Sequence, residues 1–69
     1  MSKTMGTIIC EARKNKGMTQ SELAQAMNVT DKAVSKWERD LSCPDVASLS
    51  KLAETLGISI EELMSGKSV

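Results

Sequence analysis

Apolar residues recur at helical spacing in five short stretches of the chain, and glycine, proline or a capping residue separates each stretch from the next. In residues 4–15 the side chains of Met5, Ile9 and Ala12 follow the i, i+4, i+7 pattern of an amphipathic helix. Gly17 stands where this helix would end, because glycine readily adopts the left-handed conformation that follows many last helical turns. The pattern predicts a first helix over residues 4–15.

The next two stretches are predicted to be short helices joined by a turn of three residues. Thr19 and Glu22 have the spacing of a capping box, in which each side chain bonds the other residue's backbone N–H. The apolar positions that follow are Leu23, Ala24 and Met27. In the turn, Val29 is expected to be buried between the two helices, and Thr30 is expected to cap a third helix over residues 31–39.

The fourth and fifth stretches complete an all-helical pattern. Asp45 is expected to cap a helix that ends at Gly57 and has apolar residues at Leu49, Leu52, Ala53 and Leu56. Ser59 and Glu62 have the spacing of a second capping box, before Leu63 and Met64. We therefore predict an all-α fold, a compact bundle of five helices, and a single domain over residues 1–69.

The composition favours helices and excludes several classes of function. Trp37 is the one aromatic residue, so few of the side chains that favour strands are present. The chain has no histidine, and Cys10 and Cys43 fit neither a zinc motif nor a CxxC redox pair. With no recognisable nucleophile and base, metal site or phosphate loop, we expect no enzyme, cofactor or small-molecule ligand. No membrane span or secretory signal is recognised, and a cytoplasmic location is expected.

The charges are unevenly distributed although their sum is zero. Residues 1–39 carry seven Lys and Arg against four Asp and Glu, whereas residues 40–69 carry two against five, which gives net charges of +3 and −3. A basic surface favours nucleic acid as a partner. The segment TDKAVSKWER closes the basic half, and as a helix it would turn Val34 and Trp37 inward and its charged side chains outward.

The identities of the residues indicate a protein family more specifically than the spacing of the helices does. The segments MTQSELAQAMNVTDKAVSKWERDLSCPD and LSKLAETLGISIEELM resemble the Cro/phage-repressor type (Xre-like) family of helix-turn-helix transcription regulators over about Met5 to Met64. The resemblance implies a lambda-repressor-like DNA-binding domain of five helices, with the helix-turn-helix unit at about residues 19–39 and the third helix in the major groove. Family members are usually bacterial or phage regulators that bind operators as dimers, so double-stranded DNA is the expected partner.

The N-terminal half of the third helix would then face the edges of the bases. The candidate base-reading residues are Asp31, Lys32, Ser35 and Lys36. Lys32 can donate to the O6 and N7 atoms of guanine, and Asp31 can accept from the amino group of cytosine. For Asp31 the alternative is that its carboxylate only stabilises the helix start through the helix dipole.

A second set of residues would hold phosphates on either side of this helix. The candidates are Thr19, Gln20, Thr30, Arg39 and Ser42. The family counterpart of Gln20 contacts a phosphate and supports the recognition helix, and the residue type matches. The alternatives are a simple exposed glutamine for Gln20, a solvated basic face for Lys36 and Arg39, and helix capping alone for Thr19.

Two further features concern structure and assembly. The resemblance implies an ion pair between Arg13 and Glu38, which would tie the first helix to the third; the alternative is a solvent-exposed Arg13. Ile58, Ile60 and Met64 are expected to face outward on the C-terminal segment, where they would supply a homodimer contact. Cys10 and Cys43 could act as a redox pair only if the fold brought them together, and inert thiols are expected.

These inferences favour a sequence-specific DNA-binding regulator, a repressor that binds a pseudo-palindromic operator. The alternative is a protein-interaction module, such as an antitoxin or adaptor that retains the fold. The retention of Gln20, Lys32, Ser35 and Lys36 on the expected DNA side favours the first interpretation.

Overall fold

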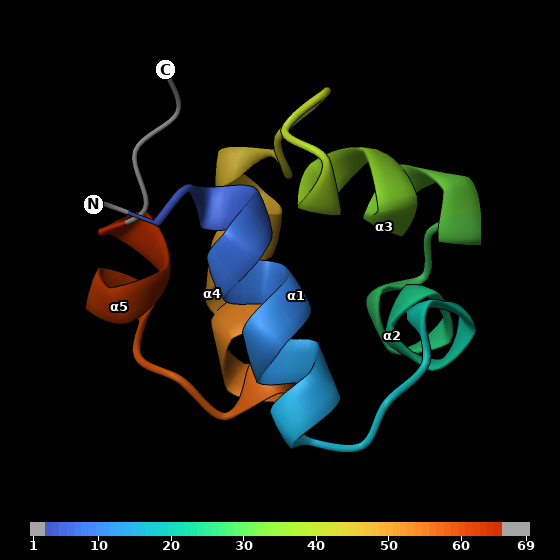
Figure 1. Ribbon diagram of the computed structural model, residues 1–69, viewed down its shortest axis with the longest axis horizontal. Helices are drawn as coiled ribbons and strands as arrows, with labels where there is room; N and C mark the ends of the chain where they lie inside the picture. Colours follow the sequence, from blue (N-terminus) through green and yellow to red (C-terminus); the bar gives the residue numbers. More distant parts are fainter. Residues whose placement is uncertain (1–2, 66–69) are drawn as a thin grey trace.

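A computed structural model describes residues 3–65 of the chain (Figure 1). Five helices follow one another: α1 (Met5–Asn15), α2 (Gln20–Met27), α3 (Asp31–Glu38), α4 (Val46–Leu56) and α5 (Ile60–Met64). No strand occurs in this part of the chain, and the predicted all-α class is confirmed. None of the helices within residues 3–65 has the length and apolar character needed to cross a membrane.

Four of the five helices begin at a hydroxyl residue. The side-chain oxygens of Thr4, Thr19, Thr30 and Ser59 each accept a hydrogen bond from the backbone N–H three residues later, at 2.9–3.2 Å. Glu22 returns the bond by accepting the Thr19 N–H at 2.8 Å, so the first predicted capping box is present. Local sequence therefore sets most of the helix starts, since a hydroxyl cap satisfies an amide that the helix leaves without a partner.

Two predicted caps differ in detail. Asp45 occupies the cap position of α4, but its carboxylate accepts from the Ser48 hydroxyl at 2.6 Å and not from a backbone N–H. At the start of α5 the Ser59 hydroxyl accepts from the Glu62 N–H, but the return bond of a capping box is not among the hydrogen bonds of residues 3–65. In the first case a neighbouring hydroxyl competes for the carboxylate that would otherwise cap the helix.

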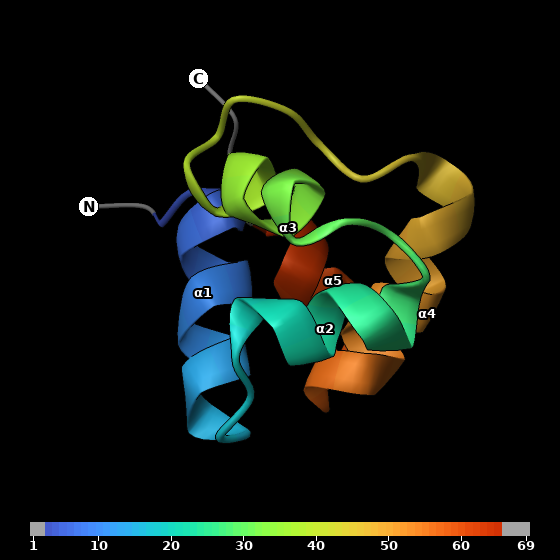
Figure 2. The same ribbon diagram turned by 90° about the vertical axis from the view of Figure 1, so that its right-hand side faces the viewer.

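Helices α1 and α4 form opposite flanks of the molecule in Figure 2, although they overlap in Figure 1. Between these flanks, α2 and α3 lie at one end of the molecule and α5 at the other. The core is aliphatic apart from one indole ring, and its buried residues are Ile9, Ala12, Leu23, Ala24, Met27, Val34, Trp37, Leu49, Leu52, Ala53, Leu56 and Leu63. The apolar positions predicted for the second and fourth helices are all among them.

The exposure predicted for Val29 and for Ile58 was wrong in both cases. Each of these residues follows a helix end in the left-handed conformation. Asn28 and Gly57 have φ values of 59° and 73°, and the next N–H in each case returns to a carbonyl five residues earlier. After this shared turn, Val29 remains 37% exposed, whereas Ile58 is half-buried against the core. Ile58 is partly covered because α5 packs back onto α1 beside it. In α3 the buried valine is Val34, and Val29 stays at the surface.

The start of α1 lies directly against the end of α3. The Gly6 N–H donates to Oδ1 of Asp40 at 3.1 Å, and a Cβ on Gly6 would lie 2.5 Å from the Trp37 carbonyl oxygen and 2.8 Å from that of Glu38. Only glycine fits at such a close approach of two backbones. This contact, which helical periodicity did not indicate, fixes where the C-terminal end of α3 sits on α1.

Candidate nucleic-acid interface

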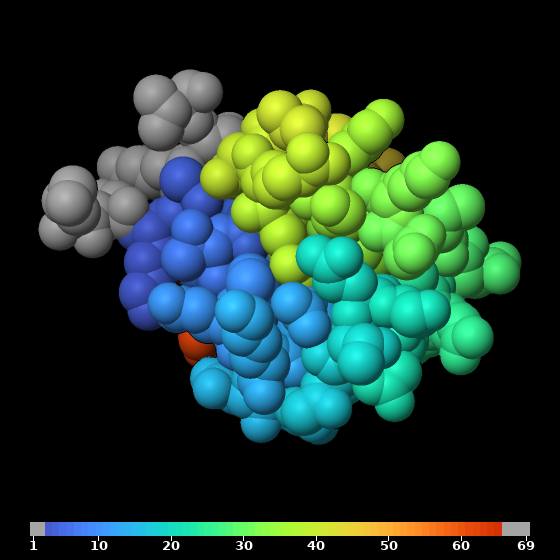
Figure 3. Space-filling model, turned by 45° about the vertical axis from the view of Figure 1, so that its right-hand side comes forward, coloured from blue at the N-terminus to red at the C-terminus, as the bar shows by residue number. Residues whose placement is uncertain are grey.

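The polar side chains of α3 form one exposed row. Val34 and Trp37 anchor the helix, with 0% and 7% of their surfaces exposed. On the opposite side Asp31, Lys32 and Lys36 are exposed and Ser35 is half-buried. Figure 3 shows the corresponding green segment at the molecular surface next to α2. The residues predicted to read bases are therefore brought together on one side of a helix whose orientation the core determines.

The candidate phosphate ligands fall at the two ends of this row. Thr19 and Gln20 lie at the start of α2, Thr30 at the start of α3, and Arg39 and Ser42 beyond the end of α3. The Thr19 and Thr30 hydroxyls already cap helices, and Nε of Arg39 donates to the Ser35 carbonyl at 3.3 Å. All of them except the half-buried Gln20 are exposed.

Beneath the row, Arg13 of α1 and Glu38 of α3 form the ion pair that the family resemblance implied. Arg13 Nε lies 2.6 Å from Glu38 Oε2, and Nη2 lies 3.3 Å from Oε1. Their side chains are only 11% and 6% exposed. Nη1 of Arg13 also donates to the Met18 carbonyl at 2.7 Å, so one guanidinium joins α1, α3 and the segment that leads into α2.

The ion pair keeps both groups charged near neutral pH. Burial alone would raise the pKa of the Glu38 carboxyl, but hydrogen bonds from Arg13 and Gln20 and the positive charge of Arg13 outweigh it and hold that pKa below its ordinary value. The hydrogen bond to Glu38 likewise raises the pKa of Arg13. A buried carboxylate is thus stabilised by donors from two other parts of the fold.

Gln20 has a role that sequence reasoning missed. Its Nε2 donates to Glu38 Oε1 at 3.0 Å, which ties the first residue of α2 to the last residue of α3. A primary amide nitrogen carries two hydrogens, so one N–H remains for another acceptor. The family match had indicated support of the recognition helix, but nothing in the local pattern identified Glu38 as the acceptor.

The cysteines and acidic residues supply no metal or disulfide site in the described part of the chain. Cys10 is half-buried and Cys43 exposed, and both are free thiols. No group of three or more Cys, Asp or Glu side chains in residues 3–65 is arranged to hold a metal ion. Cys10 Sγ lies 3.9 Å from Nη2 of Arg13, beside the ion pair.

Besides Val29 in the turn before α3, large exposed apolar side chains occur in two further places within residues 3–65. Ile60 and Met64 of α5 are 40% and 55% exposed, one helical turn apart, while Leu63 between them is buried. Leu41 and Val46, which border the loop between α3 and α4, are 64% and 85% exposed and were not singled out from the sequence. Ile58 does not belong to the exposed set, contrary to the sequence prediction.

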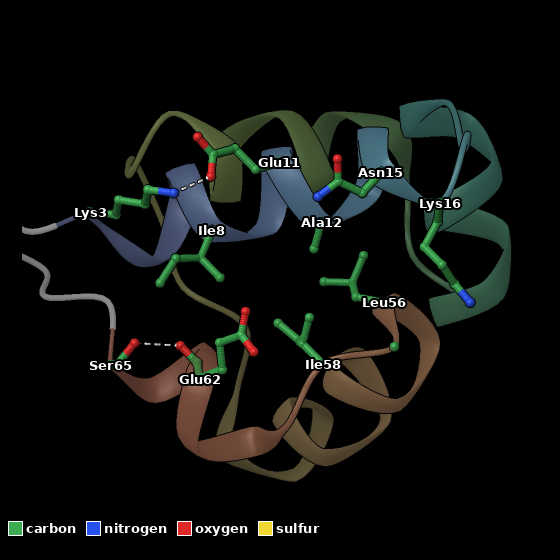
Figure 4. Close-up of a pocket in the computed structure, with 11 residues that line it drawn as sticks. Lys3, Ile8, Glu11, Ala12, Asn15, Lys16, Leu56, Ile58, Glu62 and Ser65 are labelled. Atoms are coloured by element: carbon green, nitrogen blue, oxygen red, sulfur yellow. Dashed lines mark hydrogen bonds and ion pairs between the residues drawn. The ribbon is translucent and has the colours of Figure 1, made fainter.

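A groove of about 680 Å³ lies between α1 and the segment from the end of α4 through α5 (Figure 4). Its apolar lining comes from Ile8, Ala12, Leu56 and Ile58, and the exposed ion pair of Lys3 and Glu11, at 2.6 Å, lies at its edge. No residue that lines it belongs to α2 or α3. The groove and the polar row of α3 are therefore separate surfaces.

The sequence matches the helix-turn-helix family over residues 10–63. Among curated relatives, the HTH-type transcriptional activator BcrR of Enterococcus faecalis is 35% identical over 57 residues. The match covers 83% of this chain and 28% of BcrR, so the chain spans less than a third of that relative's length.

Two solved protein–DNA complexes have the same fold. The P22 c2 repressor in complex with a synthetic operator gives a TM-score of 0.88 at 30% identity, and the match covers 96% of this chain and 100% of the repressor chain. SinR of Bacillus subtilis in complex with DNA gives a TM-score of 0.80 at 34% identity, over 88% of this chain and 98% of the SinR chain in that structure. By sequence match and by fold, the chain belongs to the Cro/phage-repressor type (Xre-like) helix-turn-helix family.

Proposed function

We propose that the chain is a single DNA-binding domain of a transcription regulator and that it acts without catalysis, in the cytoplasm of a bacterium or phage-infected cell. The observation that carries this proposal is the exposed polar row of α3, held outward by buried Val34 and Trp37. P22 c2 repressor and SinR, which share the fold, were solved with DNA. BcrR is named an activator, but we propose repression here, because occupancy of an operator requires binding alone.

Base readout is assigned to the N-terminal half of α3. A helix that enters the major groove presents its first residues to the base edges, and here these are Asp31, Lys32 and Ser35, with Lys36 one turn after Lys32. The ammonium group of Lys32 suits the two acceptors of guanine, and the carboxylate of Asp31 suits the amino group of cytosine. The side chains of Asp31, Lys32 and Lys36 make no hydrogen bond within residues 3–65, which leaves them available to bases.

Register on the duplex is assigned to contacts with phosphates. Gln20 combines a free amide hydrogen with a place at the N-terminus of α2, where backbone N–H groups and the helix dipole favour anions. Arg39 and Ser42 follow the end of α3 whose last residue Gln20 contacts, and they would add phosphate contacts there. Thr19 and Thr30 are assigned a smaller share, since their hydroxyls already cap helices. Such contacts set affinity but carry little sequence information.

Substitution of Lys32 by alanine is expected to weaken binding to the preferred duplex by about 1–3 kcal/mol and to random DNA much less, because one base contact is lost. Arg39→Ala should weaken both by a similar factor, because a phosphate contact serves every sequence, whereas Gln20→Ala would also remove a hydrogen bond from Glu38. The preferred duplex would come from selection on a random library, and affinities would be measured by fluorescence anisotropy at one fixed salt concentration.

Lys51 supplies the matched control for Lys32. It is an exposed lysine on α4, outside the polar row, and Lys51→Ala removes the same charge from the protein. If Lys32→Ala and Lys51→Ala weakened specific and random binding equally, α3 would not be a reading surface. A protein-interaction module that retained the fold would then be the better account.

We further propose that two copies bind one operator as a symmetric dimer. One recognition helix contacts too few base pairs for useful selectivity, and a two-fold pair places half-site centres about 34–36 Å apart, one turn of the duplex. Ile60 and Met64 on α5 are the assigned contact, and so small a surface gives weak association without DNA. Sedimentation of the complex should give two chains per operator, and one chain would refute the proposal.

The location of this contact is tested by placing a charge on each exposed apolar surface in turn. Ile60→Glu should weaken binding to a full operator by more than it weakens binding to an isolated half-site, because only the full operator holds two copies. Val46→Glu is the matched control, since Val46 is also aliphatic and is more exposed. Loss of cooperativity in the Val46 variant alone would move the dimer contact to the start of α4.

A further inference from the structure

Asp40 has a backbone conformation that is unusual for a residue with a side chain. Its φ is 60°, in the left-handed region, which glycine adopts freely and which asparagine and aspartate tolerate better than most other residues. The Asp40 N–H donates to the Trp37 carbonyl at 3.1 Å, and the next N–H, of Leu41, donates to the Lys36 carbonyl at 2.9 Å. Asp40 is therefore the residue at which the chain leaves α3.

The side chain of Asp40 connects this helix end to another helix. Its Oδ1 accepts the N–H of Gly6, which lies in the first turn of α1, where amides have no partner within the helix. The N-terminal end of α1 carries partial positive charge, so a carboxylate is favoured there. The absence of a side chain at Gly6 lets the two backbones approach closely enough for this bond.

The charge of Asp40 is unfavourable for binding DNA in itself. It stands between Arg39 and Ser42, both assigned to phosphates, and a carboxylate in this position repels them. Its bond to Gly6 directs the carboxylate toward α1, where the helix dipole offsets the charge. A residue that opposes affinity and adopts a disfavoured conformation must contribute through its contact with Gly6.

We propose that Asp40 is a positioning residue of the DNA-reading surface. By tying the end of α3 to the start of α1, it fixes the tilt of α3 and the start of the loop that carries Ser42. The inference rests on the proposed function, since a tilt matters only if α3 reads bases. It assigns to Asp40 a contribution to selectivity and not to affinity for DNA in general.

Two variants separate the effect of the hydrogen bond to Gly6 from the effect of the charge of Asp40. Asp40→Asn retains an oxygen that accepts from Gly6, and Asp40→Gly removes the acceptor, while both remove the charge and both fit a φ of 60°. On random DNA both should bind more tightly than the parent, because a repulsive charge is gone. The ratio of specific to random affinity should be about fivefold lower in the glycine variant than in the asparagine variant, the effect of about one hydrogen bond between neutral groups.

A DNA-free measurement accompanies the binding assay, and both are made well below the melting temperature of each variant. Hydrogen exchange at the Gly6 amide should be slow in the parent and the asparagine variant and faster in the glycine variant. Equal selectivity of the two variants would overturn the inference, whether they match the parent or both fall below it. A parent that binds preferred and random duplexes equally would instead refute the proposed function, and this inference with it.

Discussion

Replacement of Arg13 by methionine is expected to lower the free energy of unfolding by about 3–5 kcal/mol, the usual effect of removing one partner from a buried ion pair. The Glu38 side chain is 6% exposed, so its carboxylate would be left in the interior with Gln20 as its remaining donor. The Met18 carbonyl would lose its bond from Arg13 as well. The loss is a large share of the stability expected for so short a chain, and urea denaturation would measure it.

Lys14→Met is the control for this prediction, because Lys14 is the neighbouring residue of α1 and is exposed. Its effect should stay within about 0.5 kcal/mol, as for most surface substitutions. The double variant Arg13→Met with Glu38→Leu should regain part of the lost stability, since no charge would then be buried alone. Equal effects of Arg13→Met and Lys14→Met would contradict the assigned burial of the pair.

The dependence of the free energy of unfolding on pH provides a second test of the same ion pair. Because the pKa of Glu38 in the folded protein lies below its ordinary value of 4.5, its contribution to stability is present above that pH. The contribution is lost as the pH falls through the lowered pKa of the folded state. The parent should therefore lose stability on acidification below about pH 4.5 more steeply than the Arg13→Met variant, in which that pKa is no longer held down by Arg13.

Replacement of Gly6 by alanine is expected to cost about 2–3 kcal/mol, near the upper end of the usual overpacking penalty. A new Cβ would lie 2.5 Å from the Trp37 carbonyl oxygen and 2.8 Å from that of Glu38, and backbone atoms of a packed helix cannot move aside locally. Helices α1 and α3 would have to separate, which also breaks the bond from Gly6 to Asp40. In a helix without such contacts, the same change would stabilise by roughly 0.5–1 kcal/mol.

Gly17→Ala is the matched control. Gly17 has a φ of 71°, and no atom beyond Gly17 and its two chain neighbours lies within 4 Å of the position that an alanine Cβ would take, so its substitution costs only the conformational penalty of about 1–2 kcal/mol. Thermal unfolding would compare the two variants, and Gly6→Ala should lower the melting temperature by more than about 8 °C. A melting temperature at or above that of the parent would show that the two helices adapt to the methyl group.

The elements that sequence reasoning predicted well are those set by local chemistry. The hydroxyl caps Thr19 and Thr30 fix helix starts through bonds that span three residues, and periodic aliphatic side chains identify the buried faces. Trp37 and Val34 were correctly assigned to the core on this basis. The overall fold followed from such short-range patterns together with the family resemblance.

The features that were missed depend on residues distant in the chain. Gly6 lies inside a helical pattern that gives no sign of the α3 carbonyls above it, and Gln20 gives no sign of its acceptor Glu38. Val29 and Ile58 follow similar turns, and only the packing of α5 on α1 distinguishes the exposed one from the enclosed one. These outcomes depend on tertiary packing, which periodicity does not encode.

The two sides of α3 are independent of each other, and this affects how such a protein changes over evolutionary time. Val34, Trp37 and Glu38 hold the helix in place, whereas the side chains of Asp31, Lys32 and Lys36 contact no other side chain by hydrogen bond within residues 3–65. Substitutions at those three positions should alter stability by less than about 0.5 kcal/mol. On the proposed assignment of base readout to these residues, new target sequences arise by single substitutions without a poorly folded intermediate, and duplicated copies of one scaffold diverge to separate targets in the same cell.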